Sequence, residues 1–219
     1  MSDSFGDIMF TPSVQAQQER NGSRAHYARD GAGDPGDARD DALGVAEAEF
    51  IEQADGFFIA TVSETGWPYV QHRGGPRGFV NVLSPARIAF ADFRGNRQYV
   101  TAGNAAVDGR VAIIVMDYAH RRRLKLLGML RFIDVDDADP ALVKRLQLPG
   151  YRARIERVAV IDVVAFSWNC PQHITQRFTL DEVEAAARPL RARIAELEAK
   201  LGVAGDPRAQ RSEARVDGI

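Results

Sequence analysis

Hydrophobic and polar positions along the chain change from a helical period to a strand-like period near residue 57. Apolar and β-branched runs of strand length then recur, and short turns that contain glycine separate them. Residues 111–116 are almost purely β-forming, which predicts a strand buried on both faces. Residues 157–168 form the last strong strand of this region.

Helical periodicity lies on both sides of this region and interrupts it twice. We expect the first helix to start at Thr11 and Pro12, a capping residue followed by proline, and to end near residue 27. The last helix carries an apolar stripe at helical spacing, and either Thr179 or Asp181 caps it. The predicted helices cover residues 11–27, 44–54, 96–106, 139–146 and 181–201.

Six or so strands joined by short turns and two helices predict a mainly β fold, an antiparallel barrel with flanking helices. A glycine-rich bend at 74–78 is expected to let the chain continue as a strand over 79–83, and Gly128 marks a bulge or a close approach. We expect three parts: an N-terminal helix and mobile loop (1–44), the barrel domain (45–178), and a C-terminal helix with a disordered tail (179–219).

Composition narrows the class of protein. The chain has 219 residues, a net charge of −2 and a single cysteine, Cys170, so no internal disulfide can form. The acidic balance predicts no general attraction to nucleic acid or to an anionic membrane surface. No signal peptide and no membrane-spanning run is visible, and we expect a cytoplasmic protein.

The strongest candidate for chemistry is the segment of residues 94–97, where Arg94, Asn96 and Arg97 surround a glycine. It follows a buried strand and is expected to open a helix at Asn96, an arrangement that presents backbone N–H groups and guanidiniums to an anion. The alternative is a turn whose arginines are only solvated. We interpret the segment as a phosphate-binding site.

Two further groups of polar residues could face a ligand. Gln71, His72 and Arg73 end a strand beside two glycines and offer donors to a planar polar molecule, or they form a polar rim. After the last strand, Trp168 and His173 flank Cys170. Cys170 and His173 have metal-ligand spacing, but two ligands are too few for a structural zinc, so we predict no metal and an inert thiol.

In the order and spacing of its motifs, the chain resembles the FMN-binding split-barrel family related to pyridoxamine 5′-phosphate oxidase. The resemblance covers roughly residues 47–173. The matching segments are F-F-I-A-T-V-S, W-P-Y-V-Q-H-R-G-G, R-I-A-F-A-D-F-R-G-N-R-Q, V-A-I-I-V-M-D and L-G-M-L-R-F-I-D.

The resemblance implies a homodimer of six-stranded split barrels with FMN across the subunit interface. It implies that one strand supplies donors to the flavin and that the strand-to-helix segment binds the ribityl chain and the phosphate. The residues at these positions are Gln71, His72, Arg73, Phe90, Ala91, Asp92, Arg94, Asn96, Arg97 and Gln98. Catalytic residues are not identified, and Trp168 and His173 are the candidates for the substrate side.

The predicted activity is that of an FMN-dependent oxidoreductase in which flavin N5 exchanges hydride with a small organic substrate or a nicotinamide. The vitamin B6 oxidase carries an arginine-rich segment after its last strand, whereas this chain has Trp168 to His173 and then Arg177 alone, which argues against pyridoxamine phosphate as the substrate. The alternatives are a flavin-binding protein without turnover, such as a store or redox sensor, and a split barrel that uses haem or a deazaflavin.

Overall fold

The computed structural model describes residues 4–29, 42–168 and 171–202. The chain divides into two compact units, residues 1–175 and 176–219. The expected loop at 30–41, Cys170 and the expected tail beyond residue 202 lie outside the described residues. The helices are α1 (Phe5–Met9), α2 (Pro12–Arg20), α3 (Arg24–Arg29), α4 (Val45–Gln53), α5 (Val100–Val107), α6 (Pro140–Leu146) and α7 (Leu180–Leu201). The strands are β1 (Gly56–Val62), β2 (Pro68–Gly74), β3 (Val80–Ser84), β4 (Arg87–Phe93), β5 (Arg110–Asp117), β6 (Arg122–Asp134) and β7 (Ile155–Trp168).

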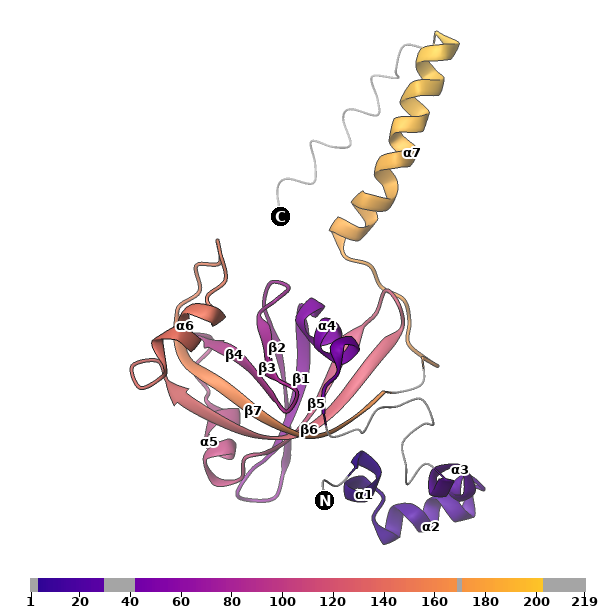
Figure 1. Cartoon of the computed structure of the whole chain (residues 1–219). Helices are drawn as coiled ribbons and strands as arrows, with labels where there is room; N and C mark the ends of the chain where they lie inside the picture. The colour runs from indigo at the N-terminus through magenta and orange to yellow at the C-terminus, as the bar shows by residue number, and fades with distance from the viewer. Residues whose placement is uncertain (1–3, 30–41, 169–170, 203–219) are drawn as a thin grey trace. The chain divides into compact units, whose positions relative to one another are not determined.

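All seven strands form one sheet in the order β2-β1-β5-β6-β7-β4-β3, and every pairing is antiparallel (Figure 1). The prediction of a mainly β, antiparallel fold is confirmed. The prediction of six strands is wrong, because residues 79–83 do not simply extend the strand before them. The bend at 74–78 separates β2 from β3, which lie at opposite edges of the sheet.

The sheet curls so that residues from distant strands share one core. The ring of Phe57 on β1 stacks on Phe79, just before β3, with ring centroids 5.8 Å apart. The same ring meets Phe90 of β4 edge-on at 5.3 Å. Phe57 therefore contacts the opposite half of the sheet, although β1 pairs only with β2 and β5. Burial of these rings removes a large apolar area from water and stabilises the curled sheet.

Strand β5 is buried on one face only. Val111, Ile113 and Val115 point into the core, whereas Ile114 on the opposite face is 40 % exposed. The prediction that this strand is buried on both faces is therefore wrong within this chain. Successive side chains of a strand point to opposite faces, so only every second residue of β5 faces the core. A run of uniformly apolar residues does not reveal which ones do.

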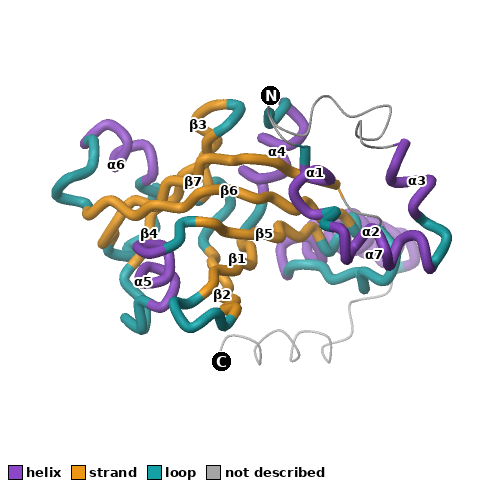
Figure 2. The backbone as a smooth tube through the Cα atoms, turned by 90° about the horizontal axis from the view of Figure 1, so that it is seen from below, coloured by secondary structure: helices purple, strands orange, loops and turns teal. Residues whose placement is uncertain are grey.

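The N-terminal region differs most from its prediction. One helix was expected over 11–27, but α2 ends at Arg20 and α3 starts at Arg24. Gly22 lies between them with φ +76°, a conformation that breaks a helix and that glycine adopts at little cost. Figures 1 and 2 show α1, α2 and α3 grouped toward the end of the sheet away from α6.

Helices α6 and α7 start close to where their predicted capping residues place them. Helix α6 begins after Asp139, whose side chain accepts a hydrogen bond from the Ala141 amide. Helix α7 begins after Thr179, which forms a capping box with Glu182, so Thr179 rather than Asp181 is the cap. No helix within the described residues has the length and apolar character needed to cross a membrane.

Gly128 marks a bulge in the long pairing of β6 with β7, where the register shifts between Leu127 and Gly128. A Cβ atom at Gly128 would lie 2.7 Å from the carbonyl oxygen of Asp162 on the neighbouring strand. Only glycine lets the two backbones approach this closely. The predicted bulge is confirmed.

Candidate functional site

Asp92, near the end of β4, is 3 % exposed and lies between two arginines from other strands. Arg157 is its cross-strand partner on β7; its Nε donates to Oδ2 at 3.0 Å, and its Nη2 also donates to that oxygen. Arg73 of β2 donates from Nη1 to Oδ1 at 2.6 Å. We call Arg73, Asp92 and Arg157 the arginine cluster. Both oxygens of the buried carboxylate are hydrogen-bonded, as a buried charge requires.

The arginine cluster carries more positive than negative charge, because two guanidiniums share one carboxylate. Their side chains are only 18 % and 17 % exposed. The Nε of Arg73 is buried and has no hydrogen-bond partner among the described residues. A buried donor without an acceptor is costly, and an anionic or carbonyl oxygen of a ligand would satisfy it.

Arg157 is the member of the cluster that the sequence did not reveal. Its guanidinium lies over the ring of Tyr99 at 4.9 Å and over the ring of Phe132 at 4.7 Å, measured to the ring centroids. These cation–π contacts fix the side chain between Phe132 of β6 and Tyr99, which directly precedes α5. The only signal in the sequence is a charge at the entrance of an apolar strand, and its partner is defined only by the strand register.

Residues 94–98 form an exposed loop, not the start of a helix as predicted. Tyr99 has a left-handed conformation with φ +54°, and α5 starts only at Val100. Arg97 is also left-handed at φ +62°, and two such non-glycine residues close together exclude helical geometry over this stretch. The prediction of a helix from Asn96 is wrong, and the backbone N–H groups near Asn96 belong to a loop.

The side chains of this loop face local partners. Arg94 Nε lies 3.5 Å from Oε1 of Glu156, and its backbone amide donates to the Arg154 carbonyl at 2.9 Å. The Asn96 side chain accepts from the Gln98 amide at 3.1 Å. A hydrogen bond with the Tyr99 side chain raises the pKa of Arg97, which stays charged. Arg94 and Arg97 therefore follow Asp92 of the arginine cluster closely in sequence, and their guanidiniums are exposed to solvent.

Gln71 and His72 lie on opposite faces of β2. Gln71 faces α5, where the hydroxyl of the buried Thr101 donates to its Oε1 at 2.6 Å. His72 is exposed and meets the ring of Phe58 edge-on at 5.3 Å. The side chains of Gln71 and Arg73 therefore share one face, and His72 can reach that face only through its backbone.

Phe90 and Ala91 offer a ligand only their backbone. Phe90 is buried in the core against Phe57 and Phe79, and Ala91 packs on the other side of β4 with Leu146 and Val158. Both were predicted to contact the cofactor. Their packing assigns their side chains to the core of the sheet.

Trp168 lies at the far end of β7 from Arg157, separated by about 36 Å of strand at about 3.3 Å per residue. Its indole Nε1 donates to Glu47 Oε1 at 2.8 Å, its ring meets Phe50 edge-on, and Arg122 lies over it at 4.6 Å. These contacts anchor α4 to the sheet. Trp168 therefore does not reach the arginine cluster of the same chain, and His173 is exposed with φ +62°.

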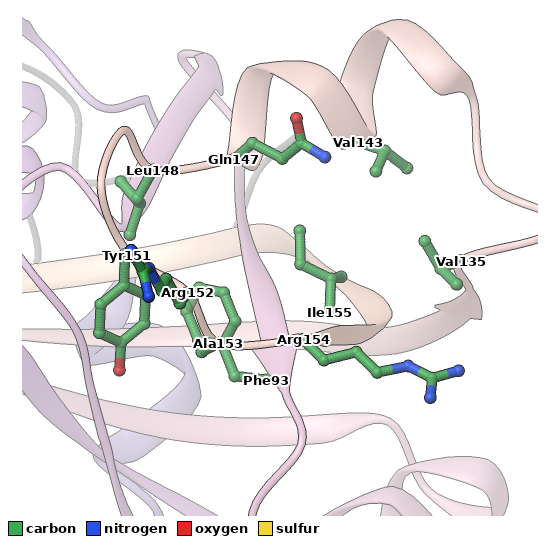
Figure 3. A pocket seen from close by; sticks show the side chains of 10 residues that line it. All are labelled: Phe93, Val135, Val143, Gln147, Leu148, Tyr151, Arg152, Ala153, Arg154 and Ile155. Carbon is green, nitrogen blue, oxygen red and sulfur yellow. The ribbon is translucent and has the colours of Figure 1, made fainter.

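A cavity of about 460 Å³ lies beyond the end of β4, between α6 and the segment that enters β7 (Figure 3). Its wall combines apolar side chains such as Val143 and Leu148 with Gln147 and Arg152. An adjoining cavity of about 380 Å³ includes Tyr99 and Arg157 in its lining. The arginine cluster therefore borders open space through Arg157. Across the described residues, no group of three or more His, Cys, Asp or Glu side chains could hold a metal ion.

A family model described as Pyridoxamine 5′-phosphate oxidase matches residues 45–163, more than half of the chain. The matched segment begins with α4, contains β1–β6 and ends within β7. No curated protein matches the sequence.

Several solved structures are similar at low sequence identity. HupZ of Group A Streptococcus is 14 % identical, with 62 % of this chain and 100 % of that chain covered and a TM-score of 0.45. A Clostridium acetobutylicum protein related to general stress protein 26 is 13 % identical, with 64 % and 95 % covered and a TM-score of 0.41. An FMN-binding protein from Syntrophomonas wolfei is 13 % identical, with 69 % and 97 % covered and a TM-score of 0.41.

Proposed function

The chain belongs to the pyridoxamine 5′-phosphate oxidase family, and we propose that it binds FMN and acts as an oxidoreductase. The observation that carries this proposal is the arginine cluster, a buried site with excess positive charge and an unmet donor at Arg73 Nε. We also infer that the curled sheet is the split barrel of this family. Such a site would suit an anionic, planar ligand, because it combines charge, donors and an adjoining cavity.

FMN fits the residues that surround the cluster. Gln71 and Arg73 would donate to the oxygen-rich edge of the ring system, and Arg73 Nε would gain its acceptor. His72 on β2 and Phe90 and Ala91 on β4 would contribute backbone groups to the same site. Asp92 would not touch the flavin, because both its oxygens are taken by arginines.

The phosphate would bind at the loop of residues 94–98. Arg94 is 46 % exposed and its pair with Glu156 is long at 3.5 Å, so exchange of that carboxylate for a phosphate costs little. Arg97, Asn96 and Gln98 add further donors within the same loop. The loop backbone, which is not helical, remains accessible to the ligand.

Bound FMN would supply a ring that accepts or donates hydride at N5. The protein would hold that ring between β2 and β4, neutralise the negative charge of the cofactor and exclude water on the core side. None of these roles needs a covalent residue. The hydride partner is a small organic molecule or a nicotinamide.

An exposed apolar patch on the outer face of β1, β2 and β5 supports the proposed homodimer with FMN at its interface. Phe58, Val70 and Ile114 are all at least 40 % exposed, and Phe58 and Ile114 are direct cross-strand partners. Contiguous apolar side chains on a sheet face favour association with another surface. A second copy on this face would bury β5 on both sides, as its sequence suggests. It could also bring Trp168 or His173 of one chain near the cluster of the other.

The test is to purify the full chain, add FMN and record the visible absorption spectrum and the flavin fluorescence. We expect a perturbed spectrum and quenched fluorescence at micromolar cofactor, followed by bleaching when NADH or NADPH is added without oxygen. Flavin behaviour identical to that of free FMN would refute the proposal. Haem or a deazaflavin in the purified protein would instead assign the site to that cofactor.

A flavin-binding protein without turnover is the second candidate. It is favoured by the engagement of Asp92 with two arginines, which gives this buried carboxylate a structural role rather than that of an acid or base for a substrate. Tight FMN binding without reduction by either nicotinamide would support a store or a redox sensor.

A further inference from the structure

Helix α7 repeats apolar residues at alternating spacings of three and four along its whole length. When Leu180 is placed at position a of a heptad, every a and d position up to Leu201 is apolar. The a positions are Leu180, Ala187, Ile194 and Leu201, and the d positions are Val183, Leu190 and Leu197. This repeat of about 3.5 residues is the pattern of a coiled-coil seam rather than of a helix packed on a globular core.

Within the described part of its own unit, residues 176–202, the seam has no partner. None of the 22 residues of α7 is buried, and the large side chains of the seam are between 41 % and 87 % exposed. Most of the stability of a protein helix comes from packing of its apolar face, and Pro189 inside α7 lowers the intrinsic stability of this helix further. Pro189 falls at position c, on the side away from the seam. A partner along the seam would supply the stability that the helix lacks on its own.

From this pattern we propose that α7 pairs with α7 of a second copy as a parallel, in-register, two-stranded coiled coil. Ile194 at an a position and Leu190 and Leu197 at d positions are the combination that favours two parallel strands. An identical helix presents the same repeat at the same spacing. A parallel pair also has the twofold symmetry of a closed homodimer.

The charges beside the seam select the parallel arrangement. In a parallel pair Arg193 at position g lies opposite Glu198 at position e of the other helix, an attractive contact. In the antiparallel pair that aligns the same seam, Arg191 would face Arg191, Arg193 would face Arg193, and Glu184 would face Glu198. Like charges at these positions destabilise a pair, so the antiparallel arrangement is disfavoured.

Disulfide trapping in the full chain tests the proposal. In a Cys170→Ser background, Leu190→Cys introduces a thiol at the centre of the seam, and Ala192→Cys introduces one at position f on the outer side. Under mild oxidation we expect Leu190→Cys to form the covalent dimer at least tenfold faster than Ala192→Cys. Equal rates, or fast trapping only when Leu190→Cys is mixed with Ile194→Cys, would overturn the parallel pairing.

A second pair of variants separates this proposal from FMN binding. Ile194→Asp introduces a charge into the seam, and Ala195→Asp introduces the same residue at the neighbouring outer position b. We expect Ile194→Asp alone to lower the helical circular dichroism at low protein concentration, while FMN titrates both variants equally. Equal helicity in the two variants would refute the coiled coil, whatever the outcome for the flavin.

Discussion

Arg73 and Asp92 form a 2.6 Å ion pair between strands that lie far apart in the order of the sheet. Strand β2 is one edge of the sheet, and β4 is next to the opposite edge. The pair therefore spans the opening of the curled sheet, and Arg157 secures the other oxygen of the same carboxylate. One buried aspartate thus holds two strands and the donors of the candidate site in place.

Replacement of Asp92 by asparagine is expected to lower the free energy of unfolding by about 3–5 kcal/mol, because it leaves two buried guanidiniums without their counter-charge. Asp162 offers a matched control, since it also lies between two arginines, Arg87 and Arg131, but is 37 % exposed. Asp162→Asn should cost less than about 1 kcal/mol. Urea denaturation of both variants measures the difference, and equal losses would contradict the role assigned to Asp92.

Removal of both loop arginines, Arg94→Ala with Arg97→Ala, is expected to weaken FMN binding by a few kcal/mol, since each charge-assisted hydrogen bond contributes about 1.5–3 kcal/mol. Riboflavin lacks the phosphate and should lose little affinity. Arg110→Ala, which removes an arginine paired with Asp108, serves as the control. Fluorescence titration measures the affinity for each flavin. Equal losses of affinity for FMN and riboflavin would show that the phosphate binds elsewhere.

Asp162 is expected to titrate below its ordinary pKa of 3.8. Burial acts to raise this pKa, but hydrogen bonds and charges from Arg87 and Arg131 outweigh it and lower the value. A lowered folded-state pKa stabilises the protein above the unfolded pKa, and this contribution is lost as pH falls through the folded value. Carboxyl NMR titration should show the pKa returning toward 3.8 in Arg87→Ala with Arg131→Ala, and an unchanged pKa would contradict this cause.

Trp168→Phe is expected to lower the free energy of unfolding by about 1–2 kcal/mol, because the hydrogen bond to Glu47 is lost while most of the ring packing remains. Glu47→Gln removes the charge on the same contact, and the double variant should show non-additive losses. Thermal denaturation of the cycle provides the measurement. Fully additive losses would mean that the two side chains do not stabilise each other.

Ile114→Glu is expected to weaken both dimerisation and FMN affinity at least tenfold, because it places a charge in the exposed apolar patch of β1, β2 and β5. Val107→Glu, at an exposed apolar position on α5, is the control and should change neither. Light scattering over a range of concentrations and flavin titration report the two quantities. Loss of FMN affinity in both variants would argue against an interface at this patch.

Much of the fold follows from local patterns. Apolar runs of strand length and the cap at Asp139 depend on residues adjacent in sequence, and a glycine inside an apolar run signals the bulge at Gly128, so the sequence alone reveals all three. The break at Gly22 depends on a left-handed glycine, which helical periodicity does not report. The strand count differs because the bend at 74–78 connects opposite edges of the sheet, a relationship that only the pairing of all strands defines.

The candidate site was harder to predict than the fold. Arg73 and Asp92 were predicted to contact the cofactor, but the sequence did not show that they pair with each other. Their ion pair joins strands from different halves of the sheet. Arg157 contacts Asp92 although the two residues are 65 positions apart in the chain. The helix expected from Asn96 begins only at Val100, because Arg97 and Tyr99 take left-handed conformations. Propensity describes single residues, whereas the site is a product of strand register.

The order of the strands also has a consequence for how the chain folds. Three groups are built from strands adjacent in both sequence and sheet: β1 with β2, β3 with β4, and β5 with β6 and β7. Only the pairings of β1 with β5 and of β4 with β7 join these groups, and each closes a long loop of chain. Contacts of low sequence separation form fastest, so the groups can assemble independently before the sheet curls. The ion pair of Arg73 with Asp92 then belongs to the last stage of folding, and changes to it should speed unfolding more than they slow folding.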